Sequence, residues 1–127
     1  MDIEKQKQKI VILAEDDRTI ARLIIFKLEK EGFKVIHFLN GEGVVDTVSK
    51  ILPDIVILDV MMPIQDGISI LKEIKANPKT KHIPVVILSA KGQEKDIIKG
   101  MEIGASDYIS KPFSPSELIV RIKRILS

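Results

Sequence analysis

The sequence has no cysteine, no tryptophan and few aromatic residues, namely four Phe and one Tyr among 127 residues. Without cysteine, disulfide frameworks, zinc-cysteine sites, iron–sulfur clusters and thiol catalysis are excluded, and a cytoplasmic location is favoured. The chain also lacks an excess of one charge, because 20 Lys and Arg stand against 18 Asp and Glu. The lysines are scattered along the sequence and form no stripe, so we expect no direct binding of nucleic acid.

Long hydrophobic runs are missing as well. The longest apolar candidates, at 10–14, 55–58 and 85–88, are far shorter than the roughly 20 residues of a membrane helix, so we expect no membrane partner. Residues 1–8 are polar and lack the apolar centre of a signal peptide. We therefore expect a polar tail at 1–8, followed by one domain at 9–127 with its own buried core.

Two apolar patterns alternate along this domain. Short runs rich in Val and Ile predict five strands, at 10–14, 35–38, 55–58, 85–88 and 108–109. Helical spacing or weaker helix signals predict helices around 20–28, at 42–50, 67–75 and 93–103, and from Pro115 onward. For the last helix, Ser114 is the expected cap and Glu117 completes a capping box. The order predicts an α/β fold of (βα)5 type, a doubly wound five-stranded parallel sheet.

Carboxylates follow two of these strands. Glu15, Asp16 and Asp17 come directly after the first strand, and Asp59 comes directly after the third. Because the ends of parallel strands share one edge of the sheet, these groups should repel one another unless a cation joins them, and an all-oxygen site suggests Mg²⁺. Each acid could instead cap the following helix, and Asp17 could be only a cap.

A hydroxyl and an ammonium group are expected at the same edge. Ser89 ends the fourth strand, and Lys111 follows the fifth. Singly, a serine there is usually a cap and a lysine is usually solvated. Together with the carboxylates, they are what transfer of a phosphoryl group to a carboxylate would require.

From these positions the sequence resembles the receiver domain of two-component response regulators. The resemblance extends from about Lys9 to Ser127 and depends on five motifs, which are I-L-A-E-D-D at 12–17, D-V-M-M-P-I-Q-D-G at 59–67, V-I-L-S-A at 86–90, G-A-S-D-Y at 104–108 and K-P-F at 111–113. It implies a flavodoxin-like sheet with strand order 2-1-3-4-5. It also implies a cis peptide before Pro112.

The resemblance assigns a role to each residue of the acidic site. Asp59 would be the phosphoacceptor, converted to 4-aspartylphosphate. Asp16 and Asp59 would bind Mg²⁺ together with the carbonyl of Met61, and Glu15 would act mainly through metal-bound water. Glu15 stands where aspartate is common in the family, and its side chain is longer by one methylene.

The resemblance also implies a switch and its partners. Lys111 would contact the phosphoryl group, and Ser89 and Tyr108 would turn inward after phosphorylation, changing the face formed by the elements at 93–103, 108–109 and 114–127. The phosphodonor would be a sensor histidine kinase or a histidine phosphotransfer protein, and the recipient a downstream effector protein or domain. A phosphorylation-dependent homodimer could form through the same face, with Asp107 and Arg121 paired across a two-fold axis.

Three other functions fit the sequence less well. An aspartyl-phosphate phosphohydrolase would need a second aspartate two positions after Asp59, where Met61 stands. A flavin or nucleotide module would need amides and hydroxyls after the first strand, where the acidic side chains would repel phosphate. A receiver-like domain that only binds partners is disfavoured because the expected acidic and basic positions are all filled. Any catalysis is expected to be the domain's own phosphorylation and dephosphorylation.

Overall fold

The structure, a computed structural model, describes residues 8–127, and within this range five strands alternate with five helices. The strands are β1 (Ile10–Ala14), β2 (Lys34–Phe38), β3 (Ile55–Asp59), β4 (Val85–Ser89) and β5 (Asp107–Ser110). The helices are α1 (Arg18–Lys30), α2 (Val44–Ile51), α3 (Gly67–Ala76), α4 (Glu94–Ile103) and α5 (Pro115–Leu126). The expected tail at 1–8 lies almost wholly outside the described residues.

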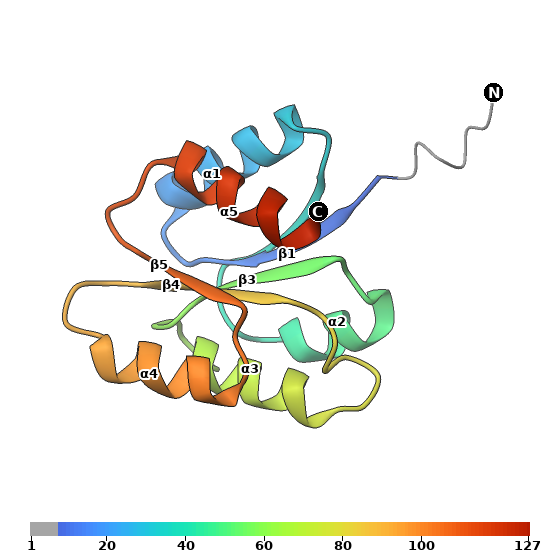
Figure 1. The fold of residues 1–127 in the computed structure, drawn as a ribbon, viewed down its shortest axis with the longest axis vertical. Coiled ribbons are helices and arrows are strands. Elements are labelled where there is room, and N and C mark those ends of the chain that lie inside the picture. The colour runs from blue at the N-terminus through green and yellow to red at the C-terminus, as the bar shows by residue number, and fades with distance from the viewer. Residues whose placement is uncertain (1–7) are drawn as a thin grey trace.

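All five strands are parallel and lie in the order β2-β1-β3-β4-β5. Helices α1 and α5 cover one face of the sheet, and α2, α3 and α4 cover the other (Figure 1). Both faces are therefore buried, which explains why β1, β3 and β4 are nearly continuous runs of buried aliphatic residues. The predicted (βα)5 fold and its strand order are confirmed.

Two separate apolar clusters result from the alternation of side chains along each strand. Ile12, Val56 and Ile87 contribute to the cluster under α2, α3 and α4. Leu13 and Ile57 point to the other face and contribute to the cluster under α1 and α5. The sheet is thus a rigid platform whose carboxyl edge holds the loops in fixed positions.

Local capping explains where several helices begin. The side chain of Asp17 accepts hydrogen bonds from the backbone N–H groups of Thr19 and Ile20 and so caps α1. Ser114 caps α5 by accepting a bond from Glu117 N at 3.1 Å. The expected capping box is only half formed, because the Glu117 carboxylate pairs with Arg121.

Helix α4 differs from its neighbours in how little it buries. Gly100 is its only buried residue, whereas α5 buries Leu118, Ile119 and Ile122. A Cβ at Gly100 would lie 2.3 Å from Ile87 Cδ1, so the helix backbone approaches the sheet closely at this point. Within residues 8–127, none of the helices has both the length and the apolarity required to cross a bilayer.

Candidate functional site

The carboxylates predicted from the strand ends do lie together. Carboxylate oxygens of Glu15, Asp16 and Asp59 are all within 4.8 Å of one another. Glu15 and Asp59 are buried, with 0% and 5% of their surface exposed, and Asp16 is exposed. The neighbouring ends of β1 and β3 therefore form one acidic cluster that is open to solvent on the side of Asp16.

Glu15 is held more firmly than the sequence suggested. Its backbone N–H donates to Phe38 O at 3.0 Å, and its carbonyl accepts a bond of 2.9 Å from His37 Nε2. Its side-chain Oε2 accepts a bond from Asp17 N at 3.0 Å. Sequence reasoning missed His37, because its role depends on the pairing of β1 with β2 and no local motif marks it.

Lys111 faces the cluster from the loop after β5. Its Nζ lies 2.9 Å from Glu15 Oε1 and 3.3 Å from Asp59 Oδ2. Its backbone N–H donates to Ser89 O at 2.7 Å, which fixes the start of the loop against the end of β4. The Lys111–Pro112 peptide is cis, as the resemblance implied. One cation therefore offsets part of the charge of two buried carboxylates.

The cluster changes the acidity of its members. Burial, and then the charge of Glu15, raise the pKa of Asp59 from its ordinary 3.8 to about 8, although Lys111 acts in the opposite direction. Burial lowers the pKa of Lys111, but its contacts with Glu15 and Asp59 outweigh that effect, and the net direction is upward. Without a further cation, Asp59 is therefore costly to ionise.

The acidic cluster fits a magnesium ion by its chemistry. All its side-chain donors are carboxylate oxygens, which Mg²⁺ prefers. Glu15 Oε1 is buried, and the Lys111 ammonium, 2.9 Å away, is the cation that faces it. A divalent cation would relieve the repulsion that raises the pKa of Asp59.

The two residues expected to switch occupy contrasting environments. Ser89 is fully buried, and its Oγ has no hydrogen-bond partner. Tyr108 is 38% exposed, so its side chain lies at the surface of β5. The structure therefore holds a buried hydroxyl without a partner near Lys111, together with an aromatic ring that is not enclosed.

The loop between β3 and α3 is tightly constrained. At Gly67, a Cβ would be 2.2 Å from the carbonyl O of Asp59, so only glycine fits there. Gly41 N, from the loop before α2, donates to Pro63 O at 3.1 Å. Ile64 has a φ of 75°, a conformation that is strained for a β-branched residue. The backbone beside Asp59 is held by these contacts.

Asp17 and the pair of Asp107 and Arg121 lie outside the acidic cluster. Asp17 is exposed and caps α1, so its interpretation as a helix cap is correct and it does not belong to the acidic cluster. Asp107 and Arg121 are paired within one chain, with Nη1 to Oδ2 at 3.1 Å. That pair therefore does not need a second copy of the chain to form.

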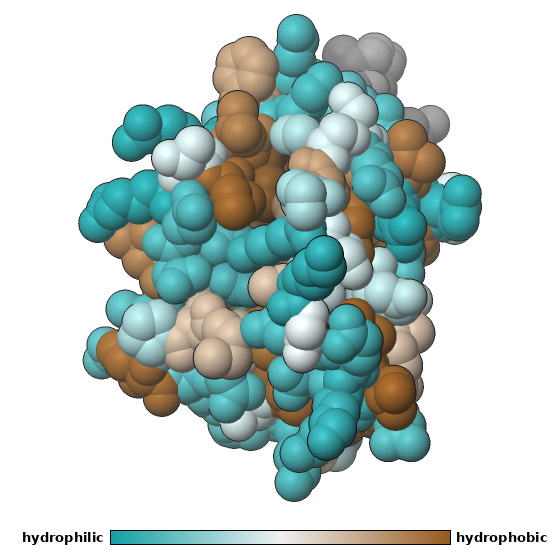
Figure 2. Space-filling model, turned by 90° about the vertical axis from the view of Figure 1, so that its left-hand side faces the viewer, coloured by the Kyte–Doolittle hydropathy of each residue, from teal (hydrophilic) through white to brown (hydrophobic). Residues whose placement is uncertain are grey.

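An apolar surface lies beside the acidic cluster. A pocket of about 110 Å³ between α1 and the loop after β5 is lined by Ile20, Leu23, Lys111 and Phe113, among others. Leu23 is 53% exposed. Figure 2 shows the carboxyl edge of the sheet, with apolar side chains gathered in its upper part, where α1 lies in Figure 1.

Comparison with known proteins agrees with this geometry. Residues 11–123 match the family described as "Response regulator receiver domain". Over 116 residues, the chain is 40% identical to the phosphate regulon transcriptional regulatory protein PhoB of Escherichia coli, covering 91% of this chain and 51% of PhoB. The chain thus spans about half the length of the curated relatives it matches.

Solved structures show the same fold. The receiver domain of the Francisella response regulator 1452 superposes with a TM-score of 0.84 at 34% identity, covering 94% of this chain and 97% of that one. The chemotaxis response regulator CheY4 of Vibrio cholerae superposes with a TM-score of 0.86 at 24% identity, covering 94% of this chain and all of the other, which supports the fold alone.

Proposed function

The chain belongs to the family of response regulator receiver domains, and from this premise we propose that Asp59 is the residue that accepts the phosphoryl group. One observation supports this most strongly. Asp59 is a buried carboxylate at the end of a central strand, and a lysine ammonium lies 3.3 Å from it. A nucleophile and a counter-charge for phosphoryl oxygens are therefore already in place.

In the proposed reaction, an Asp59 carboxylate oxygen attacks the phosphorus of a phosphohistidine. The bond from phosphorus to the imidazole nitrogen breaks, and its electron pair returns to the imidazole. Lys111 balances charge on the phosphoryl oxygens, and Ser89 Oγ supplies a hydroxyl that currently has no partner. Bound Mg²⁺, held by Asp16, Asp59 and the carbonyl of Met61 with Glu15 nearby, would supply further positive charge at the transferred group.

We propose that the phosphodonor is a sensor histidine kinase or a histidine phosphotransfer protein that docks on the apolar surface of α1. The pocket between Ile20, Leu23 and Phe113 includes Lys111, so a partner seated there would present its histidine next to the acidic cluster. Phe26, farther along α1, is 63% exposed and would extend the contact. A cytoplasmic location follows from this role, since such a donor would act there.

We propose that the output passes through the face made by α4, β5 and α5. Tyr108 lies on this face. Arg121 connects α5 to β5, because its guanidinium donates hydrogen bonds to the Asp107 carboxylate and to Tyr108 O. Phosphorylation would give Ser89 and Lys111 new partners and would alter the position of Tyr108. The recipient would be an effector protein or domain, or a second copy of the chain if the Asp107–Arg121 pair is exchanged between copies.

The experiment that tests this function is intact mass spectrometry after incubation with Mg²⁺ and acetyl phosphate. The expected result is one added phosphoryl group on the wild-type chain and none on Asp59→Asn. A matched control is Asp46→Asn, which removes an exposed carboxylate paired only with Lys50 and should be phosphorylated normally. Phosphorylation of Asp59→Asn to the same extent as wild type would refute the assignment.

A further inference from the structure

The topology gathers several lysines at the edge of the sheet opposite to the acidic cluster. In a parallel sheet, every connection from a helix to the next strand arrives at the amino edge. In this chain Lys9 directly precedes β1 at the same edge, Lys34 is the first residue of β2, and Lys79, Lys81 and His82 lie on the connection before β4. The lysines are scattered in sequence but lie close in space.

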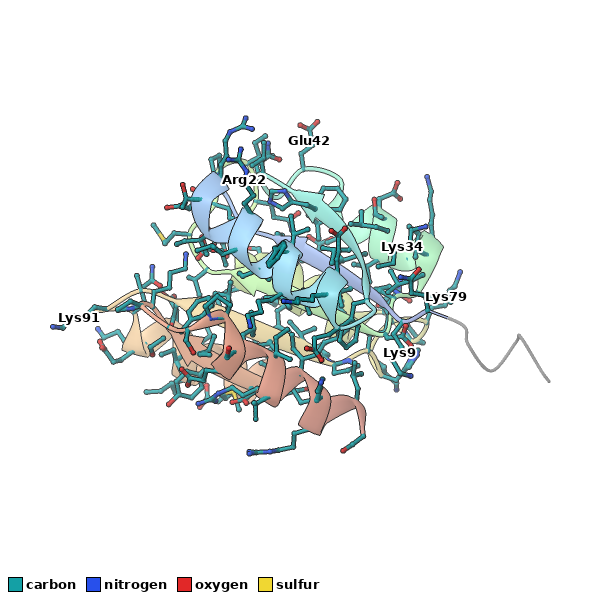
Figure 3. The ribbon with its side chains drawn as sticks, turned by 90° about the horizontal axis from the view of Figure 1, so that it is seen from above. Lys9, Arg22, Lys34, Glu42, Lys79 and Lys91 are labelled. Carbon is teal, nitrogen blue, oxygen red and sulfur yellow. The ribbon has the colours of Figure 1, made fainter. Side chains whose placement is uncertain are left out.

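The contacts and the figure agree on this placement. Lys34 N donates to Lys9 O at 2.9 Å, so these two residues are neighbours at the ends of β1 and β2. Lys9, Lys34 and Lys79 lie at one end of the molecule, and Lys91 lies at the opposite end (Figure 3). We name Lys9, Lys34, Lys79 and Lys81 the basic edge.

Most carboxylates in the same region already have a partner, although Asp54 keeps its negative charge. Glu31 pairs with Lys123, and Asp107 pairs with Arg121. Asp54 accepts a bond from Ile10 N at 2.8 Å. By contrast, the four exposed lysines of the basic edge form no ion pair within residues 8–127. Their positive charge is therefore available to a partner.

The segment before β4 presents its lysines on an ordered backbone. Lys79 N donates to Asn77 Oδ1 at 2.9 Å, and Lys81 N donates to Asn77 O at 2.8 Å. Lys75 Nζ donates to the carbonyls of Lys81 and Ile83. The ordering cost of binding would thus be limited largely to the lysine side chains.

From these observations, and against the expectation drawn from the scattered lysines of the sequence, we propose that the basic edge binds the phosphate backbone of nucleic acid, without reading its sequence. Neighbouring strands are about 4.8 Å apart, so the starts of β2 and β4, three spacings apart in the sheet, are separated by about 14 Å. That span corresponds to about four successive phosphates along one strand of a duplex. Lysines supply point charges without the arginine forks that read base edges, which favours contact with phosphate alone. The inference depends on no step of the proposed phosphoryl transfer.

The test uses the whole chain and a fluorescein-labelled DNA duplex of mixed sequence, with binding measured by fluorescence anisotropy over a series of salt concentrations. Four phosphate contacts predict that log K falls with log salt with a slope of about −3 to −4. Reversing two charges of the basic edge, with Lys34→Glu and Lys79→Glu, should weaken binding at least about tenfold and reduce the slope by about two.

A matched control separates the position of the charges from their number. Lys72→Glu with Lys95→Glu makes the same change in net charge on exposed residues of α3 and α4, and should alter affinity by less than about threefold. Equal loss in the two double variants would overturn the proposal, as would a wild-type slope shallower than −1. Tighter binding of poly-glutamate than of the duplex at the same salt concentration would also overturn it, by identifying an acidic protein segment as the partner.

The same variants keep this inference separate from phosphorylation. Lys34→Glu with Lys79→Glu leaves the acidic cluster unchanged, so acetyl phosphate should still add one phosphoryl group to it. Loss of DNA binding with normal phosphorylation supports the basic edge as an independent site. Loss of both would show that the substitutions disturb the fold. In that case Lys34→Gln with Lys79→Gln, which removes the charges without reversing them, should still weaken DNA binding several-fold, and unchanged binding would overturn the proposal.

Discussion

Replacing Asp59, the proposed phosphoacceptor, by asparagine should stabilise the protein when Mg²⁺ is absent. Burial and the charge of Glu15 raise the pKa of Asp59 from 3.8 to about 8. A group whose pKa is higher in the folded state favours folding while it is protonated, and this contribution is lost as the pH rises through the folded-state pKa. The wild-type protein should therefore become less stable, relative to Asp59→Asn, between about pH 4 and about pH 8.

The size of the effect follows from the two pKa values. An amide keeps the shape of the side chain and cannot ionise, so Asp59→Asn should gain up to about 4 kcal/mol near pH 7 and only about 1.6 kcal/mol near pH 5. The remaining Glu15 and Lys111 still form a neutral pair, with Nζ 2.9 Å from Oε1. Adding Mg²⁺ should narrow the difference, because the ion stabilises the wild-type carboxylate cluster.

The assay is urea unfolding followed by far-ultraviolet circular dichroism, in EDTA, at about pH 5 and about pH 7. Asp46→Asn is the control, since it removes an exposed partner of Lys50 and should change the free energy of unfolding by no more than about 1 kcal/mol at either pH. The reasoning would be refuted if Asp59→Asn gave no gain near pH 7, or the same gain at both pH values.

Three further changes test other parts of the structure. Asp17→Ala removes the cap of α1 and should lower the free energy of unfolding by about 1 kcal/mol, measured by urea unfolding, while leaving phosphorylation by acetyl phosphate intact; loss of phosphorylation would place Asp17 in the site after all. Gly67→Ala forces a methyl group against Asp59 O and should cost more than about 2 kcal/mol, whereas an unchanged unfolding midpoint would show that the loop can yield. Mg²⁺ at about 100 times its dissociation constant should raise the free energy of unfolding of the wild-type chain by about 2.7 kcal/mol, measured by urea unfolding. EDTA should reverse this gain, and the gain should be much smaller in Asp59→Asn.

The sequence predicted the fold well because the sheet is buried on both faces. Continuous aliphatic runs such as Ile55–Leu58 identified the strands, although each of the last four extends by one residue or more where backbone pairing continues into polar positions. Ser110 is one such residue, paired with Ser89 across β4 and β5. Strand ends in parallel sheets share an edge, so the acidic cluster could be predicted from the same pattern.

What could not be predicted depends on register and on contacts between distant loops. The bond from His37 to the carbonyl of Glu15 requires β1 and β2 to pair as they do. The requirement for Gly41 arises from the loop before α3, since a Cβ there would lie 2.0 Å from Gln65 O. The pair of Asp107 and Arg121 was expected between two copies, and its formation within one chain depends on β5 and α5 being neighbours, since the two residues are 14 positions apart.

Helix α4 has an energetic consequence for the molecule as a whole. Fully burying one large aliphatic side chain contributes about 1.5–3 kcal/mol, so moving α5, with three such residues, would forfeit several kcal/mol. Moving α4 would release a glycine and only partly buried neighbours. One charge-assisted hydrogen bond contributes about 1.5–3 kcal/mol, which is comparable to the free energy needed to move such a helix. Amide hydrogens of α4 should accordingly exchange with solvent through the least costly opening among the five helices.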